Sequence, residues 1–158
     1  IQIFNLLNKT KDGKVDKHPF HRCIIDLNRD GFVVELSTIN IYSNPILMAS
    51  TLYGSVLGYD IRDTNCNPTI RFSAPKQGYF TSLECDTFGC WVAAGTNKGV
   101  INLWDVRFPS TPVKSIQTSN NNISRMKINC MDFKKIICCY QNTTRPVSII
   151  NLDSWNGH

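Results

Sequence analysis

The sequence reads Thr51-Leu52-Tyr53-Gly54-Ser55-Val56-Leu57-Gly58-Tyr59-Asp60-Ile61-Arg62 and, 45 residues later, Thr96-Asn97-Lys98-Gly99-Val100-Ile101-Asn102-Leu103-Trp104-Asp105-Val106-Arg107. The two stretches share Thr, Gly, Asp and Arg in register, with an aromatic residue before the Asp and a branched aliphatic residue after it. A short apolar run precedes each copy, Ile46–Ala49 in the first and Trp91–Ala94 in the second, and a third run, Ile136–Cys139, lies another 45 residues on. The chain is therefore built from an internal repeat.

A repeat of about 40–45 residues that ends on Trp-Asp is typical of the blades of a WD-repeat β-propeller. The third apolar run is followed by Val147–Leu152, where Ile150-Asn151 take the Trp-Asp place, and Ile1–Leu6 look like the same strand of an earlier blade, with Phe4-Asn5 at that place. The predicted fold class is all-β, with about three blades plus part of another. Because a propeller needs about 4–8 blades to close, we expect a fragment of a larger propeller.

Turn-rich segments divide the chain into blades. We expect the end of a preceding blade with a basic insertion at residues 1–32, one blade at 33–75, a second at 76–117, and a degenerate, incomplete blade at 118–158. No amphipathic helix is expected. Expressed alone, residues 1–158 should be insoluble or partly unfolded, because two blade faces would lack a neighbour. The expected strands are Arg22–Ile25, Phe32–Leu36, Ile46–Ser50, Ser55–Asp60, Thr69–Phe72, Phe80–Cys85, Trp91–Ala94, Gly99–Val106, Val113–Ile116, Ser124–Met131, Ile136–Tyr140 and Val147–Leu152.

Four residues of the repeat have a structural explanation. Gly54 and Gly99 stand at the tip of the central hairpin of their blades, where a tight turn needs a positive φ that glycine adopts at little cost. Tyr59 and Trp104 lie in a strand that neighbouring blades cover on both faces, so their rings should fill the space between sheets. These positions predict packing rather than chemistry.

The strand ends carry the candidates for an interface. Asp60 and Asp105 should accept backbone N–H bonds in the turn that follows. Arg62 and Arg107, two residues further on, either pair with carboxylates at the blade rim or meet a partner. With Phe108 beside them they are the residue types that dominate interface energies.

The net charge of +5 is unevenly distributed, because residues 9–22 alone carry +3. Lys11, Lys14 and Lys17 within this loop are further interface candidates. Such a loop could meet anionic lipid, nucleic acid or an acidic partner, but a basic run of this kind is more often a solvated insertion between strands, which is the interpretation we favour. We expect protein partners and no nucleic acid.

The seven cysteines are odd in number and include no C-x-x-C pair. Most should be small buried hydrophobes of a chain in a reducing compartment. Five of them fall in apolar, strand-like stretches: Cys23, Cys85, Cys130, Cys138 and Cys139.

The sequence motifs that would indicate catalysis or metal binding are incomplete or missing. Asp26, Asn28 and Asp30-Gly31 match the first half of a calcium loop, but Ser37 stands where the loop needs Glu. There is no phosphate-binding G-x-x-x-x-G-K-[ST], no H-E-x-x-H and no G-x-S-x-G. We therefore expect no catalytic, cofactor-binding or metal-binding residue, and no enzyme activity in this segment.

Taken together, the blades resemble the WD-repeat domain of the regulatory subunit 4 family, the kinase-like scaffolds of class III phosphatidylinositol 3-kinase complexes. The resemblance covers about residues 17–108 well and 123–153 loosely. The chain departs from the family pattern at Tyr59, where Trp is usual, and at Ile150-Asn151, where Trp-Asp is usual. The residues that carry the resemblance are Lys17-His18-Pro19-Phe20, Cys23-Ile24-Ile25-Asp26, Asp30-Gly31-Phe32-Val33-Val34, Gly54–Arg62, Cys90–Thr96, Gly99 and Trp104–Phe108.

The resemblance implies a parent with an N-terminal protein-kinase-like domain, a helical-repeat middle and this propeller. It further implies a non-catalytic scaffold, cytoplasmic and peripheral on endosomal or autophagic membranes. Its partners would be the lipid-kinase catalytic subunit, Beclin-type coiled-coil subunits and a Rab GTPase. The alternative from another class is a substrate receptor of a cullin–RING ubiquitin ligase, in which paired WD-x-R boxes such as those ending in Arg62 and Arg107 help to bind a propeller-shaped adaptor.

Overall fold

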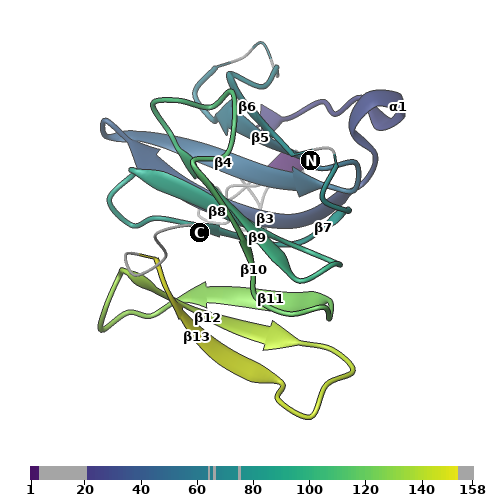
Figure 1. Cartoon of the computed structure of the whole chain (residues 1–158). Helices are drawn as coiled ribbons and strands as arrows, with labels where there is room; N and C mark the ends of the chain where they lie inside the picture. Colours follow the sequence, from purple (N-terminus) through teal and green to yellow (C-terminus); the bar gives the residue numbers. More distant parts are fainter. Residues whose placement is uncertain (4–20, 64, 66, 75, 153–158) are drawn as a thin grey trace, which may run out of the picture.

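The computed structural model of the chain describes residues 1–3, 21–63, 65, 67–74 and 76–152 (Figure 1). The Phe4-Asn5 position and Lys11, Lys14 and Lys17 lie outside these residues. Of the residues described, only α1 is helical, and it is far too short to cross a membrane. The elements are β1 (Gln2–Ile3), β2 (His21–Arg22), α1 (Leu27–Asp30), β3 (Val33–Ile41), β4 (Asn44–Thr51), β5 (Ser55–Asp60), β6 (Ile70–Ser73), β7 (Phe80–Cys85), β8 (Trp91–Thr96), β9 (Val100–Asp105), β10 (Lys114–Gln117), β11 (Ile123–Ile128), β12 (Lys135–Tyr140) and β13 (Val147–Asn151).

The strands form antiparallel sheets in simple chain order. Two sheets have four strands, β3-β4-β5-β6 and β7-β8-β9-β10, one has three, β11-β12-β13, and β1 pairs with β2. The three larger sheets are stacked face to face, with the last one at the end of the stack (Figure 1). Their first strands lie next to each other, β7 packing on β3 and β11 packing on β7. Sheets that meet along their first strands and follow one another in sequence are arranged as propeller blades.

The core lies between the sheets. Trp104 of β9 is fully buried and contacts Phe72 and Phe80, with ring centroids 5.7 Å and 6.0 Å away. Phe72 belongs to the sheet before and Phe80 to the same sheet as Trp104, so the indole joins two blades. A second cluster, which includes Ile101 and Met126, joins the next two blades in the same way. Small residues allow the close approach, because a side chain at Gly95 would meet Ser82, Ile123 and Met126.

Tyr59 takes the place of Trp104 in the first complete blade and is also buried. Its hydroxyl donates a hydrogen bond to the carbonyl oxygen of Ile24 at 2.8 Å. Burial raises the pKa of this phenol to about 12. The indole nitrogen of Trp104, in contrast, has no hydrogen-bond partner among the described residues. The phenol ring of Tyr59 is smaller than an indole ring. It suits this site because the carbonyl oxygen of Ile24, in the segment before β3, accepts the hydrogen bond of its hydroxyl.

One short helix was not expected from the sequence. Asp26 begins α1 by accepting hydrogen bonds from the backbone nitrogens of Asn28 and Arg29 at 3.0 and 3.3 Å. Asp30, at its end, is fully buried and binds Arg71 of β6 through both carboxylate oxygens, at 2.5 and 3.1 Å. The aspartates that resemble half a calcium loop therefore cap a helix and hold an ion pair.

Three strands end three or more residues away from the expected position. β2 ends at Arg22 rather than Ile25, because it pairs with β1 only at Gln2 and Ile3. β3 continues from Leu36 to Ile41, because it pairs with β4 as far as a two-residue turn at Tyr42-Ser43. Both turn residues have positive φ, 49° and 65°, which the sequence does not signal because neither is glycine or asparagine. β11 ends at Ile128 rather than Met131, because the Asn129 side chain accepts the backbone N–H of Met131 in a turn.

The cysteines follow the strands. Cys85 and Cys138 are buried, as expected, and burial raises the pKa of each thiol to about 12. Cys23 is also buried and Cys139 is half-buried. The prediction was wrong for Cys130, which lies beyond the end of β11 and is exposed.

Trp104→Ala should destabilise the propeller by about 3–5 kcal/mol, the cost of removing a large buried ring. Trp104→Phe should cost much less, since the indole N–H that it removes makes no hydrogen bond in the described residues. Urea unfolding of the complete propeller measures both. Equal losses for the two variants would mean that the indole N–H is bonded, and an unchanged midpoint for Trp104→Ala would mean that the ring is not in the core.

Asp30→Asn should destabilise the fold by about 3 kcal/mol, because it leaves the Arg71 guanidinium without its buried carboxylate. Hydrogen bonds from Arg71 and Arg29 lower the pKa of Asp30. The ion pair therefore contributes fully above the unfolded value of about 3.9, and its contribution is lost as the pH falls through the lower folded pKa. Unfolding midpoints measured from pH 7 to pH 3 should show a shallower acid loss in Asp30→Asn, whereas Asp26→Asn, which keeps the helix cap, should behave like the parent.

Candidate protein-interaction face

The Asp-Arg pairs at the strand ends have the same geometry in both complete blades. Asp60 accepts hydrogen bonds from the backbone nitrogen, Nε and Nη2 of Arg62, at 3.0, 2.9 and 2.6 Å. Asp105 accepts the same three from Arg107, at 2.9, 3.0 and 2.5 Å. The spacing of two residues explains the geometry. The Asp carboxylate accepts the backbone N–H of the arginine in the turn, and the turn brings the arginine guanidinium back over the same carboxylate.

Each pair presents its cation to solvent. The Arg62 and Arg107 side chains are 56% and 68% exposed, whereas those of Asp60 and Asp105 are 21% and 23% exposed. The Arg107 guanidinium lowers the pKa of Asp105, which stays ionised, and the carboxylates raise the pKa of both arginines. Exposed pairs of this kind add little to stability. Their outward-facing guanidinium groups are therefore available to an acidic partner.

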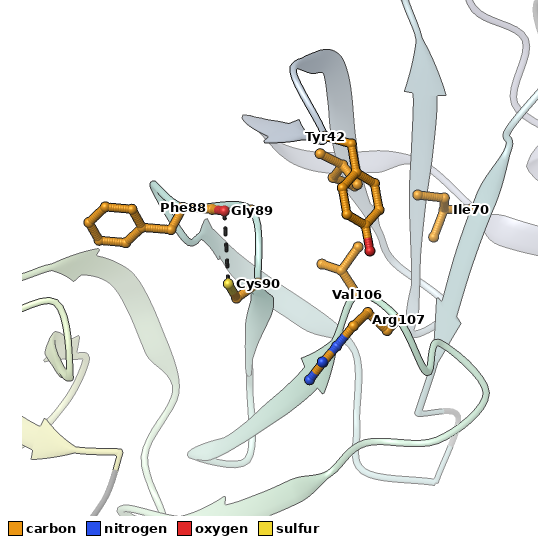
Figure 2. Close-up of a pocket in the computed structure, with 8 residues that line it drawn as sticks. Tyr42, Ile70, Phe88, Gly89, Cys90, Val106 and Arg107 are labelled. Atoms are coloured by element: carbon orange, nitrogen blue, oxygen red, sulfur yellow. Dashed lines mark hydrogen bonds between the residues drawn. The ribbon is translucent and has the colours of Figure 1, made fainter.

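Arg107 borders a hollow of about 590 Å³ between the first and second complete blades. Its walls come from the β3–β4 turn, the β7–β8 turn and the residues after β9 (Figure 2). Tyr42 and Val106 lie on one side, Phe88 and Cys90 on the other, and the Phe88 ring points away from Tyr42 (Figure 2). Ile41 and Ile70 make the floor apolar.

Gly89 holds the β7–β8 turn against the first blade. It has a φ of 77°, and a side chain there would collide with the backbone oxygen of Asn40 near the end of β3. Only glycine fits both the positive φ and the close approach. The hollow is therefore bounded by backbone that cannot easily move.

The repeat residues named from the sequence lie in the core and in buried turns. Tyr59 and Trp104 are buried, and Gly54 and Gly99, with φ of 81° and 76°, form turns at the other end of the sheets. Neither group reaches the hollow.

The interface candidates are also distributed unevenly. Arg107 lines the hollow and lies 5.8 Å from the exposed ring of Phe108. Arg62 occupies the matching turn of the preceding blade but does not line the hollow. Lys11, Lys14 and Lys17 lie outside the described residues.

Sequence reasoning missed the aromatic residues of the hollow, Tyr42 and Phe88, because both lie in turns rather than in the repeated strands. A signal was present, since single aromatic residues interrupt the otherwise polar stretches Tyr42–Asn44 and Asp86–Gly89. Across the described residues no group of His, Cys, Asp or Glu is arranged to hold a metal ion. The arrangement presents an apolar hollow with a cationic rim, which suits binding.

Comparison with curated proteins finds one complex subunit and several serine/threonine-protein kinases, and no protein-family profile matches the chain. It is 33% identical over 78 residues to the target of rapamycin complex subunit LST8 of Saccharomyces cerevisiae. It is 33% identical over 100 residues to the serine/threonine-protein kinase VPS15 of Arabidopsis thaliana, and 30% over 67 residues to the putative VPS15 kinase of Komagataella pastoris. These matches involve 49%, 60% and 42% of this chain but only 25%, 7% and 5% of those proteins.

Solved structures confirm the predicted fold. The β-propeller domain of Myceliophteria thermophila Cps50 (Swd1) superposes with a TM-score of 0.65 at 10% identity, over 79% of this chain and 37% of that one. A chain of the mitotic checkpoint complex superposes with a TM-score of 0.58 at 16% identity, over 68% of this chain and 32% of that one. The chain has the fold of part of a WD-repeat β-propeller.

Arg107→Ala should leave the thermal unfolding midpoint close to that of the parent, whereas Asp105→Ala should lower it. The reason is that Asp105 also accepts the backbone N–H of Arg107 and so holds the turn, while the guanidinium is mostly in solvent. Arg145→Ala, an exposed arginine in the β12–β13 turn, gives the baseline for losing a surface charge. A loss for Arg107→Ala as large as that for Asp105→Ala would show a structural role for the guanidinium.

Proposed function

We propose that this chain is a non-catalytic scaffold segment of a class III phosphatidylinositol 3-kinase complex. In this role the propeller holds the coiled-coil subunits near the lipid-kinase catalytic subunit and presents a face to a Rab GTPase. The parent carries its protein-kinase-like domain outside these residues. The complex would work on the cytoplasmic side of endosomal and autophagic membranes, with the propeller bound to the membrane only through the complex.

The observation that carries this proposal is the recurrence of VPS15 among the relatives. A plant, a yeast and an amoeba, Dictyostelium discoideum, each contribute a VPS15 protein that is 27–33% identical over 67–100 residues. VPS15 proteins form the kinase-like scaffold family that residues 17–108 resemble. Propellers of many kinds share Trp-Asp repeats, so agreement with one named protein from three distant organisms supports that family over the others.

The geometry agrees with a binding role. Asp60 and Asp105 accept hydrogen bonds from the arginine two residues further on, within the same turn. The rings of Tyr59 and Trp104 lie in the core. What faces solvent at this end of the blades is a pair of guanidinium groups and an apolar hollow. These are features that a protein partner uses.

Similarity to LST8 favours a second assignment at the level of the complex. LST8 is named as a subunit of the target of rapamycin complex and matches 78 residues at 33% identity. Both assignments make the propeller a subunit that binds proteins, and they differ in the kinase that it accompanies. The cullin–RING alternative is supported only by the exposed side chains of Arg62 and Arg107. The ion pairs with Asp60 and Asp105 explain the presence of these arginines without a cullin adaptor.

Affinity purification of the complete protein from its own cells tests the proposal. We expect a phosphatidylinositol 3-kinase catalytic subunit and coiled-coil subunits in the purified material. Deleting the propeller should reduce the coiled-coil subunits while the rest of the parent stays soluble. Recovery of a target of rapamycin kinase in their place would support the second assignment. Recovery of a cullin adaptor that is lost on Arg107→Ala would overturn both.

A further inference from the structure

Three aromatic residues occupy equivalent turns of three successive blades. Tyr42 lies in the β3–β4 turn, Phe88 in the β7–β8 turn and Phe133 in the β11–β12 turn, at spacings of 46 and 45 residues. The spacing is that of the repeat itself. We call these residues the aromatic row.

The aromatic row is repeated but not buried. Residues repeated at a fixed period in a propeller normally serve packing between blades, as Tyr59 and Trp104 do. Tyr42, in contrast, is 83% exposed, Phe88 is 68% exposed and Phe133 is 39% exposed. A single exposed aromatic residue needs no explanation, but a contiguous apolar surface on one face does.

The three turns border two adjoining hollows. Phe88 lines the hollow beside Tyr42 and also a second hollow of about 560 Å³, between the second complete blade and the last one. Phe133 lines that second hollow and meets Phe88 edge to face, with ring centroids 5.2 Å apart. Met131, one of the most exposed apolar side chains described, also lines it. The two adjoining hollows therefore share Phe88, whose ring points away from Tyr42 and contacts Phe133.

Charge on this face indicates the kind of partner. Arg107 borders the first hollow and turns its guanidinium to solvent, while its partner Asp105 is largely covered. Asp86, at the second hollow, is buried and accepts the backbone N–H of Cys90. Asp132 is paired with Lys135 at 2.7 Å. The carboxylates are thus covered or paired, and the most exposed charged group beside the first hollow is the Arg107 guanidinium, which faces solvent while it also pairs with Asp105.

We propose that the aromatic row binds a segment of a protein partner that carries bulky apolar side chains and flanking carboxylates. The apolar side chains fill the two hollows, and the carboxylates meet Arg107 and, one blade further, Arg62. Two hollows of this volume accept side chains better than they accept the flat surface of a bilayer. The inference rests on the proposed function in treating the chain as a binding segment, and not on which complex it joins.

Site-specific photocross-linking in the complete protein tests the proposal. p-Benzoylphenylalanine is placed at Tyr42 or at Met131, and, as the matched control, at Tyr53, an exposed aromatic residue in the β4–β5 turn at the other end of the sheets. The protein is irradiated in cells and purified, and the attached molecule is identified by mass spectrometry. We expect positions 42 and 131 to capture one partner segment that is apolar and rich in Asp and Glu, and position 53 not to capture it.

A synthetic peptide of the captured segment then measures binding to the complete protein. Arg107→Gln should weaken its affinity about tenfold, the scale of an arginine at an interface centre, and added salt should weaken it too. Phe88→Ser should abolish binding, with circular dichroism to confirm that the protein is folded. Capture of lipid alone, of this same chain or of a basic segment would overturn the proposal, as would capture of the same segment from position 53 or no capture at all.

The outcomes separate this inference from the proposed function. If the purified material lacks a phosphatidylinositol 3-kinase catalytic subunit but positions 42 and 131 capture an acidic, apolar segment, the assignment to the complex is wrong and the aromatic row stands. If the catalytic subunit is present and neither position captures a partner segment, the complex stands and the aromatic row is wrong.

Discussion

Packing between neighbouring blades is the interaction on which the rest of this structure depends. A four-stranded sheet with apolar residues on both faces cannot be stable by itself, because each face needs a cover. Trp104 meets this need by contacting Phe72 of the preceding blade and Phe80 of its own. The indole nitrogen of Trp104 has no hydrogen-bond partner in the described residues. Close packing of rings and aliphatic side chains therefore holds these blades together.

Polar contacts then fix how the blades are placed. The Glu35 carboxylate of β3 accepts the backbone N–H of Leu83 in β7 at 2.7 Å. Thr81 makes the equivalent link onward, donating to the carbonyl oxygen of Ile123. Each link joins the first strands of two successive blades. Directional bonds of this kind set the position of one sheet against the next, which apolar contacts alone do not.

The sequence predicted the strand bounds well where the residue pattern repeats from blade to blade. Strands β5, β7 and β9 were predicted within about one residue, because turn residues bound them and the repeat aligns them. The sequence did not predict the structure where a residue adopts a backbone conformation or a degree of burial that is unusual for its type. A two-residue turn at Tyr42-Ser43 lacks glycine, so β3 was predicted too short. The burial of Asp30 was not predicted, because its partner, Arg71, lies 41 positions away on another strand. The burial of that carboxylate depends on tertiary contact, which no local pattern contains.

In the candidate site, the repeat could be recognised in the sequence, but whether the repeated residues are buried or exposed could not. Period alone cannot distinguish a residue that packs from one that is displayed, because both recur at the same spacing. Position in the blade decides between them. Trp104 lies in the middle of a strand with a sheet on each side, and its burial follows. Tyr42, Phe88 and Phe133 lie in turns, beyond the last strand residues, and their rings stay largely or partly exposed even though Phe88 and Phe133 contact each other. The contact between Phe88 and Phe133 leaves Tyr42 unexplained, and the recurrence of exposed aromatic residues in three turns favours contact with something outside the propeller.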